Sequence, residues 1–407
     1  MKDNNQIAAV FDDLTEFYAI QPIIDRLKNE GMPIDIIVPY DSGYNGLANH
    51  TFNKIKEFGY SPKKDAPKDK TYKILLTPYP GLDVVNRIKF IYHLRYPYGV
   101  ISSKPNPALM PNHFYYYDAI LSFNKYDGFL SAYGPTIYPL PYWRYYNFKK
   151  TKTKNSKPTL LLLPTFGADT SFINHLNTNT IQEIKEHFII VAKAHHAVHF
   201  GIDGEKVLQK LQEASDEFYD SDTAIDVLLK KADIVLSDNS GAIFESIYAD
   251  IPVAIFTNNA NARHLGKLDT LQYQLVQDGI IPQAKKPNEI LPILLNIKPY
   301  IKKQKKVKAN LFICDREDPF QDFLKVIKHY ITIDENHDYR KIVHDIFLKS
   351  LIEQEQKIKH LEKEIIKQEE TTASLTKHIE SIYNSTSWKI TKPLRKIKSK
   401  GNSNAKE

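Results

Sequence analysis

The sequence predicts an α/β protein with two parallel sheets, followed by a long helix. Short apolar segments alternate with helical ones, the alternation starts again in the middle of the chain, and a long stretch without glycine or proline follows. Strands that alternate with helices are typical of parallel sheets, because the chain must cross over between neighbouring strands. A chain of 407 residues has room for two domains of ordinary size and an extension.

Three apolar segments predict the strands of the first half. They cover residues 7–11, 34–38 and 73–77. The first strand runs into a polar turn and then a helix that ends at Gly31, which indicates a βα unit. Residues 92–104 are rich in aromatic side chains, and we expect them to form a loop.

The pattern restarts after residues 151–157, a polar and basic segment that we take as a linker. Further strands are predicted at residues 159–163, 188–192, 234–237 and 253–256, and this series ends near a helix at residues 320–331. The first domain would cover residues 1–150 and the second residues 151–335. The cleft between them is the expected binding site, because parallel sheets bind ligands beyond the carboxyl ends of their strands.

Residues 338–383 are predicted to form a helix with a coiled-coil seam. Apolar residues recur there with heptad spacing, although polar residues interrupt both core positions. One core position holds Leu351, Ile358, Ile365, Thr372 and Ile379, and the other holds Gln354, Leu361, Gln368, Leu375 and Ile382. Self-association into a homo-oligomer is one interpretation, and a single helix packed on its own domain is the other.

The last segment, residues 384–407, carries most of the excess positive charge. The formal net charge is +7, and from Lys389 onward six lysines and one arginine stand against a single acid. Apolar and basic residues interleave there, which favours contact with an anionic membrane. The expected contact residues are Trp388, Lys389, Lys392, Arg395 and Lys396. A solvated tail and a tail that docks on another protein are the alternatives, and nucleic acid is not an expected partner because no reader fold accompanies the charge.

The rest of the composition favours a cytoplasmic protein. Cys314 is the only cysteine, which excludes a disulfide within the chain and a cysteine-cluster zinc site. The first residues lack the basic and apolar regions of a leader, and no uncharged apolar run approaches the ~20 residues of a membrane span. We therefore expect the protein to be cytoplasmic and peripheral to the inner face of the plasma membrane.

Residues 223–256 form the most informative segment for function. An apolar strand runs into a polar turn, and a helix follows. The turn holds Asp238, Asn239, Ser240 and Gly241. Backbone NH groups at such a turn can bind phosphate, and Ser240 adds a hydroxyl donor. Simple capping of the helix is the alternative, because Asp, Asn and Ser are also preferred N-cap residues.

Lys193, His195 and His196 follow a predicted strand, where the cleft is expected. A lysine and an imidazole there can hold a diphosphate, and His195 is the expected catalytic residue because histidine can carry a proton near neutral pH. A metal site is the weaker interpretation, since neighbours in an extended segment point to opposite faces. We expect no metal ligands and no required cofactor beyond a nucleotide-activated donor.

Other candidates lie at the ends of further strands. Thr165 follows the strand at residues 159–163 and is expected at the donor pocket, although a plain turn explains it equally well. In the first half, His93 or an acid such as Asp13 or Glu16 is expected to activate an acceptor hydroxyl. The aromatic surroundings of His93 are more typical of packing than of chemistry.

These segments together resemble the CDP-glycerol glycerophosphotransferase family of teichoic-acid and capsule synthesis. Residues 238–241 resemble the family's Asp-Tyr-Ser-Ser turn, and Glu245 stands where an acidic residue is usual. Residues 193–196 resemble its Lys-Leu-His-Pro turn, and residues 163–165 its Ala-Pro-Thr loop. The resemblance covers residues 92–256 and implies the GT-B arrangement, in which two Rossmann-like domains face each other across a cleft.

The sequence departs from this family at the catalytic base. Tyr98 and Gly99 stand where the family has a His-Gly pair. A tyrosine with an ordinary pKa near 10 is a poor base at neutral pH. Three interpretations follow: His93 takes the place of the base, the donor differs from that of the family, or activity is lost. Residues 381–395 resemble a C-terminal signature of many bacterial surface-polysaccharide glycosyltransferases, which indicates the pathway but not the reaction.

The sequence therefore predicts a transferase of bacterial cell-surface polymer synthesis, of the teichoic-acid, capsule or O-antigen type. It would move glycerol phosphate, or a related polyol phosphate, from a CDP-linked donor to a growing lipid-linked chain. Lys193, His195 and Ser240 would hold the donor phosphates, and Thr165 and Asp238 would shape the pocket. The alternatives are a GT-B glycosyltransferase that uses a nucleotide sugar, an inactive membrane-associated scaffold and a sugar-nucleotide epimerase.

Overall fold

The structure is a computed structural model, and it divides the chain into two compact units. These are Met1–Asp338 and Tyr339–Glu407, and each is described by itself. The structure describes residues 6–39, 47–78, 87–97, 99–100, 114–145, 148–151, 155–166, 171–198, 203–238, 240–257, 271–334 and 338–391.

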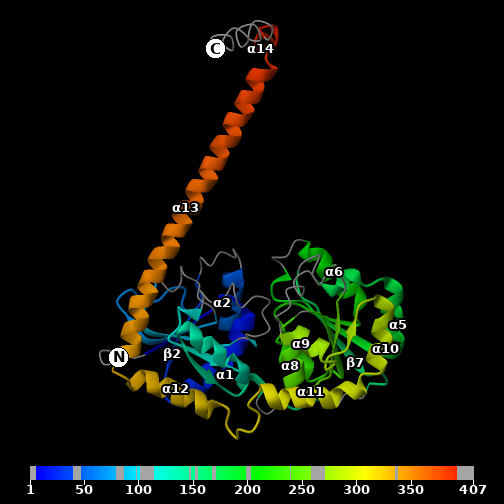
Figure 1. Cartoon of the computed structure of the whole chain (residues 1–407). Helices are drawn as coiled ribbons and strands as arrows, with labels where there is room; N and C mark the ends of the chain where they lie inside the picture. The colour runs from blue at the N-terminus through cyan, green and yellow to red at the C-terminus, as the bar shows by residue number, and fades with distance from the viewer. Residues whose placement is uncertain are drawn as a thin grey trace. The chain divides into compact units, whose positions relative to one another are not determined.

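The first unit contains two parallel six-stranded sheets (Figure 1). The first sheet has the order β2-β1-β3-β4-β5-β6. Its strands are β1 (Ile7–Val10), β2 (Ile34–Ile37), β3 (Thr71–Thr77), β4 (Lys89–Arg95), β5 (Ala119–Ser122) and β6 (Thr136–Pro139). The second sheet has the order β12-β11-β10-β7-β8-β9. Its strands are β7 (Thr159–Leu163), β8 (Ile189–Lys193), β9 (Glu217–Tyr219), β10 (Ile234–Ser237), β11 (Val253–Phe256) and β12 (Gln283–Ala284).

Helices cover the sheets and connect their strands. On the first sheet they include α1 (Leu14–Asn29) and α2 (Leu47–Glu57). The second half contributes α5 (Thr178–His187), α6 (Gly204–Ala214), α7 (Ile225–Leu229), α8 (Ala242–Tyr248), α9 (Leu271–Gln277), α10 (Ile290–Leu295), α11 (Lys298–Leu311) and α12 (Phe320–Thr332). The predicted α/β class with two parallel sheets is confirmed.

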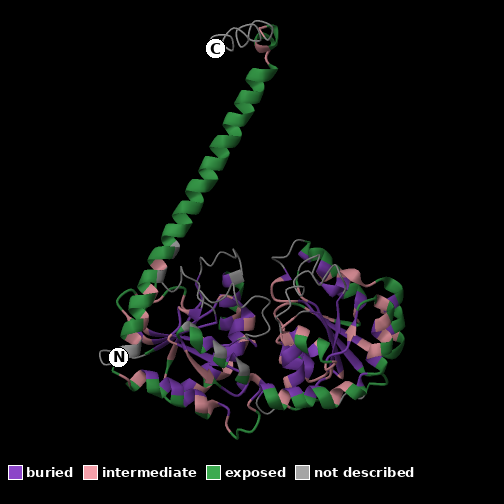
Figure 2. Ribbon diagram, in the orientation of Figure 1, coloured by how far each residue is buried: buried purple, intermediate pink, exposed green. Residues whose placement is uncertain are grey.

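The central strands β7, β10 and β11 of the second sheet form because their sequences are almost entirely apolar. β7, β10 and β11 are buried at every residue (Figure 2), whereas the edge strands β6 and β9 are partly exposed. A parallel sheet is covered on both faces, so its strands need continuous apolar sequences rather than alternating ones. Burial on both faces therefore explains why these three strands begin and end where the sequence predicts.

Two elements differ from the sequence prediction. Residues 92–95 belong to β4 instead of a loop, because the buried positions of this strand accommodate polar side chains. Helix α12 packs on the first sheet rather than ending the second half. The rings of Phe323 and Trp143 are 5.7 Å apart, and those of Tyr330 and Tyr92 are 5.0 Å apart. The apolar periodicity of α12 shows that one face is buried but not which sheet it covers.

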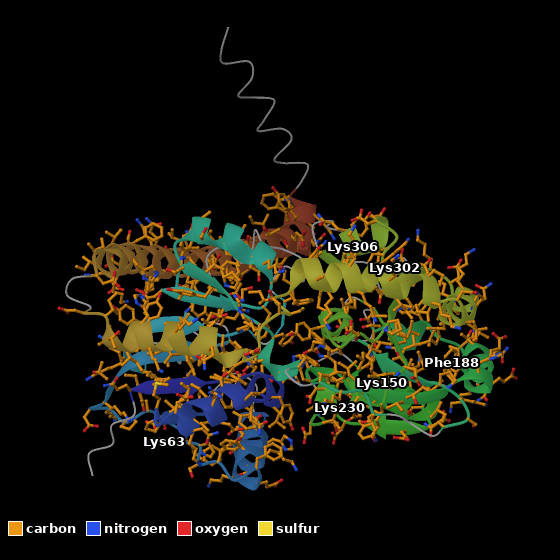
Figure 3. All side chains as sticks on the ribbon, turned by 90° about the horizontal axis from the view of Figure 1, so that it is seen from below. Lys63, Lys150, Phe188, Lys230, Lys302 and Lys306 are labelled. Carbon is orange, nitrogen blue, oxygen red and sulfur yellow. The ribbon has the colours of Figure 1, made fainter. Side chains whose placement is uncertain are left out.

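Helix α11 is a basic surface element of the first unit. It contains six lysines and no acidic residue, and its buried side is formed by Gln304, Val307 and Leu311. Lys302 and Lys306 project outward from this helix (Figure 3). The positive charge of the chain is therefore concentrated at α11 as well as in the C-terminal segment.

The second unit consists of helices α13 (Tyr339–Asn384) and α14 (Thr386–Ile390). Most of α13 is exposed along its length (Figure 2). The predicted long helix is present, and its coiled-coil seam stays a prediction. No helix in the described part of the chain combines the length and the apolar character that a membrane span requires.

Candidate functional site

A cavity lies between the two sheets of the first unit, where strands of both sheets end. From the first half it is lined by Thr15, Tyr18, Arg95, Gly99 and Arg144, and from the second by Pro164, Lys193, His195, His196, Ser240, Gly241 and Glu245, among others. Five of these residues, Lys193, His195, Ser240, Gly241 and Glu245, are site residues that the sequence predicts, and the fold brings them to one cavity. Open parallel sheets bind ligands at this edge, since their loops and helix starts converge there.

Lys193 is the last residue of β8 and lines the cavity. Its Nζ donates to the carbonyl oxygen of Ala194 at 2.8 Å and lies 3.4 Å from that of Ser221. Burial, together with the charge of Arg144, lowers the pKa of Lys193 to about 8. A lysine held in this way gains more than a solvated one from an incoming anion, because the anion restores its charged state.

His195 and His196 form a stacked pair directly after Lys193, with ring centroids 4.1 Å apart. The backbone NH of Ala197 donates to Nδ1 of His195 at 3.1 Å. In the neutral ring the proton is therefore on Nε2, which is a hydrogen-bond donor. His195 thus has the tautomer that a phosphate oxygen needs.

The turn before α8 supplies Ser240 and Gly241 to the cavity. Oγ of Ser240 accepts from the NH of Ala242 at 3.3 Å, so that its hydroxyl proton points elsewhere. The capping interpretation and the ligand interpretation of this turn are therefore compatible. Asn239 lies outside the described residues.

Asp238 acts on the neighbouring loop rather than on the cavity wall. It is 1% exposed, and its carboxylate accepts from the NH of Thr165 at 3.0 Å and from that of Phe172 at 3.1 Å. Because a carboxylate can accept several hydrogen bonds, Asp238 fixes both ends of the loop after β7. Thr165 is held by this contact, while Pro164 of the same loop lines the cavity.

Glu245 joins the two halves of the first unit. It accepts from the hydroxyl of Tyr142 at 2.8 Å, and Nη1 of Arg144 lies 3.2 Å from the same oxygen. Arg144 also contacts Asp226 at 3.2 Å. Burial raises the pKa of Glu245, and Arg144 opposes this shift. The acid thus positions a buried arginine at the cavity.

Asp13 faces the histidine pair from the first half. It is the N-cap of α1, where its carboxylate accepts from the NH of Glu16 at 2.9 Å. Its Oδ2 lies 3.9 Å from Nε2 of His196. Burial raises the pKa of Asp13, and two backbone hydrogen bonds and the charge of Lys193 oppose this. A carboxylate with a raised pKa is a stronger base, which suits the activation of a hydroxyl.

The same turn also offers a carboxylate cluster. Ligand oxygens of Asp12, Asp13 and Glu16 lie within 4.8 Å of one another and could hold a cation. Burial and the two neighbouring acids raise the pKa of Glu16 well above its ordinary value, so that a proton can replace a cation there. The expectation that no metal is required stays a prediction.

His93 lies inside the first sheet and does not line the cavity. It is 1% exposed, its Nε2 lies 2.8 Å from the hydroxyl of Thr77, and its Nδ1 lies 2.9 Å from the carbonyl oxygen of Tyr116. The expected role at an acceptor hydroxyl does not fit this placement. Tyr98 lies outside the described residues, and Gly99 lines the cavity.

Sequence reasoning missed two arginines of the site. Arg144 precedes the linker, and its partners lie far away along the chain, so no local pattern signals its role. Arg95 ends β4, is 7% exposed and lines the cavity. Its Nη1 has no hydrogen-bond partner among the described residues. An anionic ligand would accept a hydrogen bond from this unpaired donor and offset the cost of burying the guanidinium.

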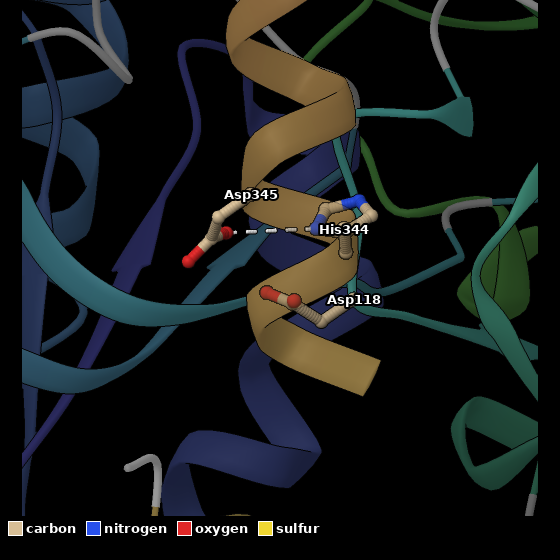
Figure 4. A group of neighbouring side chains, drawn as sticks. All are labelled: Asp118, His344 and Asp345. Atoms are coloured by element: carbon tan, nitrogen blue, oxygen red, sulfur yellow. Dashed lines mark ion pairs between the residues drawn. The ribbon is translucent and has the colours of Figure 1, made fainter. Parts of the chain in front are cut away.

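The expected membrane residues belong to the second unit. The ring of Trp388 packs edge-on against Tyr383 at 5.0 Å, and Lys389 is exposed on α14. Lys392, Arg395 and Lys396 lie outside the described residues. Earlier in this unit, Nδ1 of His344 lies 3.7 Å from a carboxylate oxygen of Asp345 (Figure 4).

No family model and no curated protein matches the sequence. Solved structures match its fold. The wall teichoic acid polymerase TagF is 13% identical, with a TM-score of 0.51 over 86% of this chain and 90% of that chain. MnaA of S. aureus, solved with UDP, is 13% identical, with a TM-score of 0.53 over 81% of this chain and 97% of that one.

A protein of Listeria monocytogenes described as a UDP-N-acetylglucosamine 2-epimerase is 15% identical, with a TM-score of 0.50 over 81% of this chain and 97% of that one. The chain has a GT-B-like fold. At these identities the matches establish the fold and leave the reaction open.

Proposed function

We propose that the protein is a transferase that binds a nucleotide-diphosphate donor in the cavity and acts in bacterial surface-polymer synthesis. One observation carries the proposal: the guanidinium of Arg95 is buried at the cavity with an unpaired Nη1 among the described residues. Because a buried unpaired donor is costly, the site favours an anionic ligand. Lys193 and Arg144 add positive charge on the same cavity.

The donor phosphates would lie among Lys193, His195 and Ser240. A nucleotide that leaves during transfer gains negative charge, and preorganised donors stabilise that charge without reorganisation. Nε2 of His195 and the hydroxyl of Ser240 are neutral donors for this purpose, while Lys193 and Arg95 supply charge. Together these residues would offset the negative charge on the phosphates, a role that a divalent cation often has in phosphoryl transfer.

Asp13 would activate the acceptor hydroxyl. Its carboxylate comes from the first half and lies 3.9 Å from Nε2 of His196. In this role its carboxylate takes the proton of the hydroxyl while the hydroxyl oxygen attacks the transferred group. His196 would stabilise the charge of Asp13 before that transfer.

The transferred group is proposed to be glycerol phosphate or a related polyol phosphate from a CDP-linked donor. The resemblance of residues 193–196 and 238–241 to glycerophosphotransferases supports this choice, and TagF is a wall teichoic acid polymerase of similar fold. A nucleotide-sugar reaction is the second candidate, since the MnaA structure of similar fold contains UDP. The acceptor would be a lipid-linked polymer at the inner face of the membrane, reached through the basic C-terminal segment.

The test is donor turnover by the purified full chain. CDP-glycerol is compared with CDP-, UDP- and GDP-linked sugars, with and without a polymer acceptor. Release of CMP from CDP-glycerol with extension of the acceptor would support the proposal. Release of a nucleoside diphosphate from a sugar donor would replace it with a glycosyltransferase, and a free altered sugar without acceptor would indicate an epimerase.

Variants connect the activity to the cavity. His195→Ala and Arg95→Leu are expected to lose turnover, whereas His187→Ala, at the exposed end of α5, is the matched control and should keep it. Lack of binding of every donor to the folded wild-type protein would contradict the proposal and favour a scaffold.

A further inference from the structure

Helix α13 exposes two series of large apolar side chains at heptad spacing. The first includes Ile358, Ile365 and Ile379, and the second includes Leu361, Leu375 and Ile382. Each of these side chains is between 45% and 59% exposed. These side chains recur along one side of a helix of 46 residues, with Gln368 and Thr372 between them, and so form a larger apolar surface than scattered single residues do.

We propose that α13 pairs with α13 of a second copy of this chain as a parallel, in-register, two-stranded coiled coil. The residue types at the two core positions support two strands. β-branched isoleucine dominates one position, and leucine is prominent at the other, a combination that favours parallel dimers. This inference does not depend on the donor or on the reaction proposed above.

The polar core residues determine the orientation. In a parallel in-register pair, Gln368 of one copy meets Gln368 of the other, and their carboxamides can hydrogen-bond to each other. An antiparallel pair that aligns the apolar residues of this seam would place Gln368 opposite Thr372, whose hydroxyl already donates within its own helix, so the two carboxamides would not meet. Because a buried polar group without a partner is costly, the parallel arrangement is favoured.

Thr372 fits the same seam. Its hydroxyl donates to the carbonyl oxygen of Gln368 within its own helix at 2.8 Å. The hydroxyl is therefore satisfied inside one helix, and its methyl group is available to pack against a second copy. Burial of Thr372 thus leaves no donor without an acceptor.

Charges beside the seam favour the same orientation. In the parallel register Lys357 lies opposite Glu362 of the second copy, while Glu364 faces Glu369. In the antiparallel register Glu369 of one copy faces Glu369 of the other, and Lys357 loses its acidic partner. The parallel pair therefore has an attraction that the antiparallel pair lacks.

A parallel pair would place two basic C-terminal segments at the same end of the coiled coil. Each segment is rich in lysine from Lys389 onward. Two weak membrane-binding segments on one assembly raise the effective concentration of the second after the first has bound. The paired helix would thus convert a weak single-segment contact into binding of both copies to one anionic membrane.

The first test is the mass of the full chain in solution, by light scattering or sedimentation. We expect twice the chain mass of 47.0 kDa for the wild type. Ile365→Glu should give the single-chain mass, because it places a charge in the seam. Ile366→Glu is the matched control: Ile366 is 56% exposed against 54% for Ile365, but it lies outside the seam and should leave the dimer intact. A wild type of single-chain mass, or equal dissociation by both variants, would overturn the proposal.

The second test addresses orientation. In a Cys314→Ser background, Leu361→Cys places identical thiols opposite each other only if the helices are parallel and in register. Mild oxidation should then give a covalent dimer, whereas Ile366→Cys should not. A dimer by mass that fails to cross-link through Leu361→Cys would overturn the parallel register while leaving the proposed reaction untouched.

Discussion

Glu245 on α8 accepts a hydrogen bond from the hydroxyl of Tyr142 at 2.8 Å, across the two halves of the first unit. The side chain of Arg144 is 4% exposed and lies between Glu245 and Asp226. This network places a buried positive charge at the wall of the cavity and connects the segment after β6 to the second sheet. Site geometry and the contact between the halves therefore depend on the same residues.

Glu245→Ala should destabilise the fold as well as the site. Removal of one partner leaves Arg144 buried and only partly compensated, so the free energy of unfolding should fall by about 3 kcal/mol. Urea unfolding measures this change. Lys308→Ala, which breaks the more exposed pair with Asp250, should cost only about 0.5 kcal/mol. Equal losses for both variants would show that the buried network contributes nothing special.

Lys193→Met should stabilise the protein while it weakens donor binding. Burial lowers the pKa of Lys193 to about 8 from an ordinary value of 10.5, so the folded state bears the cost of a charged lysine below pH 8. The methionine variant removes this cost, and its free energy of unfolding at pH 7 should be higher by about 1 to 3 kcal/mol.

The gain should disappear as the pH rises from 8 towards 10.5, because the wild-type lysine loses its proton in both states. Urea unfolding at several pH values and donor titration by calorimetry test the two halves of this prediction. A variant that is less stable at every pH would contradict it.

The sequence predicts the apolar strands well because burial on both faces leaves a simple pattern. The predicted segments at residues 159–163, 234–237 and 253–256 coincide with β7, β10 and β11. Continuous apolar runs bounded by polar turns are typical of parallel strands. The ends of these strands could therefore be predicted, and the residues after them include several that line the cavity.

The parts of the fold and of the site that the sequence does not predict depend on contacts between distant segments of the chain. β4 contains His93 and Arg95 within an aromatic segment that the sequence suggests is a loop, and the hydrogen bonds of His93 to Thr77 and Tyr116 explain how a buried strand accommodates this histidine. Arg144 meets Glu245 from 101 positions away along the chain, and no periodicity signals such a pair. Sequence patterns predict elements, whereas buried polar partners require the tertiary structure.

Asp238 and Ser240 should differ in effect although they are two positions apart. Asp238→Ala leaves the NH groups of Thr165 and Phe172 without their acceptor, so the free energy of unfolding should fall by about 2 to 4 kcal/mol. Ser240→Ala removes a half-buried hydroxyl and should change stability by about 0.5 kcal/mol or less, while donor affinity falls. Urea unfolding paired with donor titration separates the two, and a large stability loss for Ser240→Ala would contradict the assignment.

Asp13→Asn is the variant that isolates the proposed base. Asparagine keeps an acceptor for the NH of Glu16 and is itself a good N-cap, so the start of α1 should be preserved. The carboxylate is lost, so turnover should fall by about 100-fold or more with donor affinity nearly unchanged. Single-turnover kinetics and calorimetry measure these quantities separately.

His93→Leu is the counterpart for the residue that the sequence favours equally. Because His93 is buried between Thr77 and Tyr116, its replacement leaves polar groups without partners and should lower the free energy of unfolding by about 1 to 3 kcal/mol. The protein that remains folded should still turn over donor at a rate near that of the wild type. The opposite result would be a stable His93→Leu variant without turnover and an active Asp13→Asn variant. It would assign the base to His93, because a residue that serves only the fold can be replaced without loss of turnover as long as the variant stays folded.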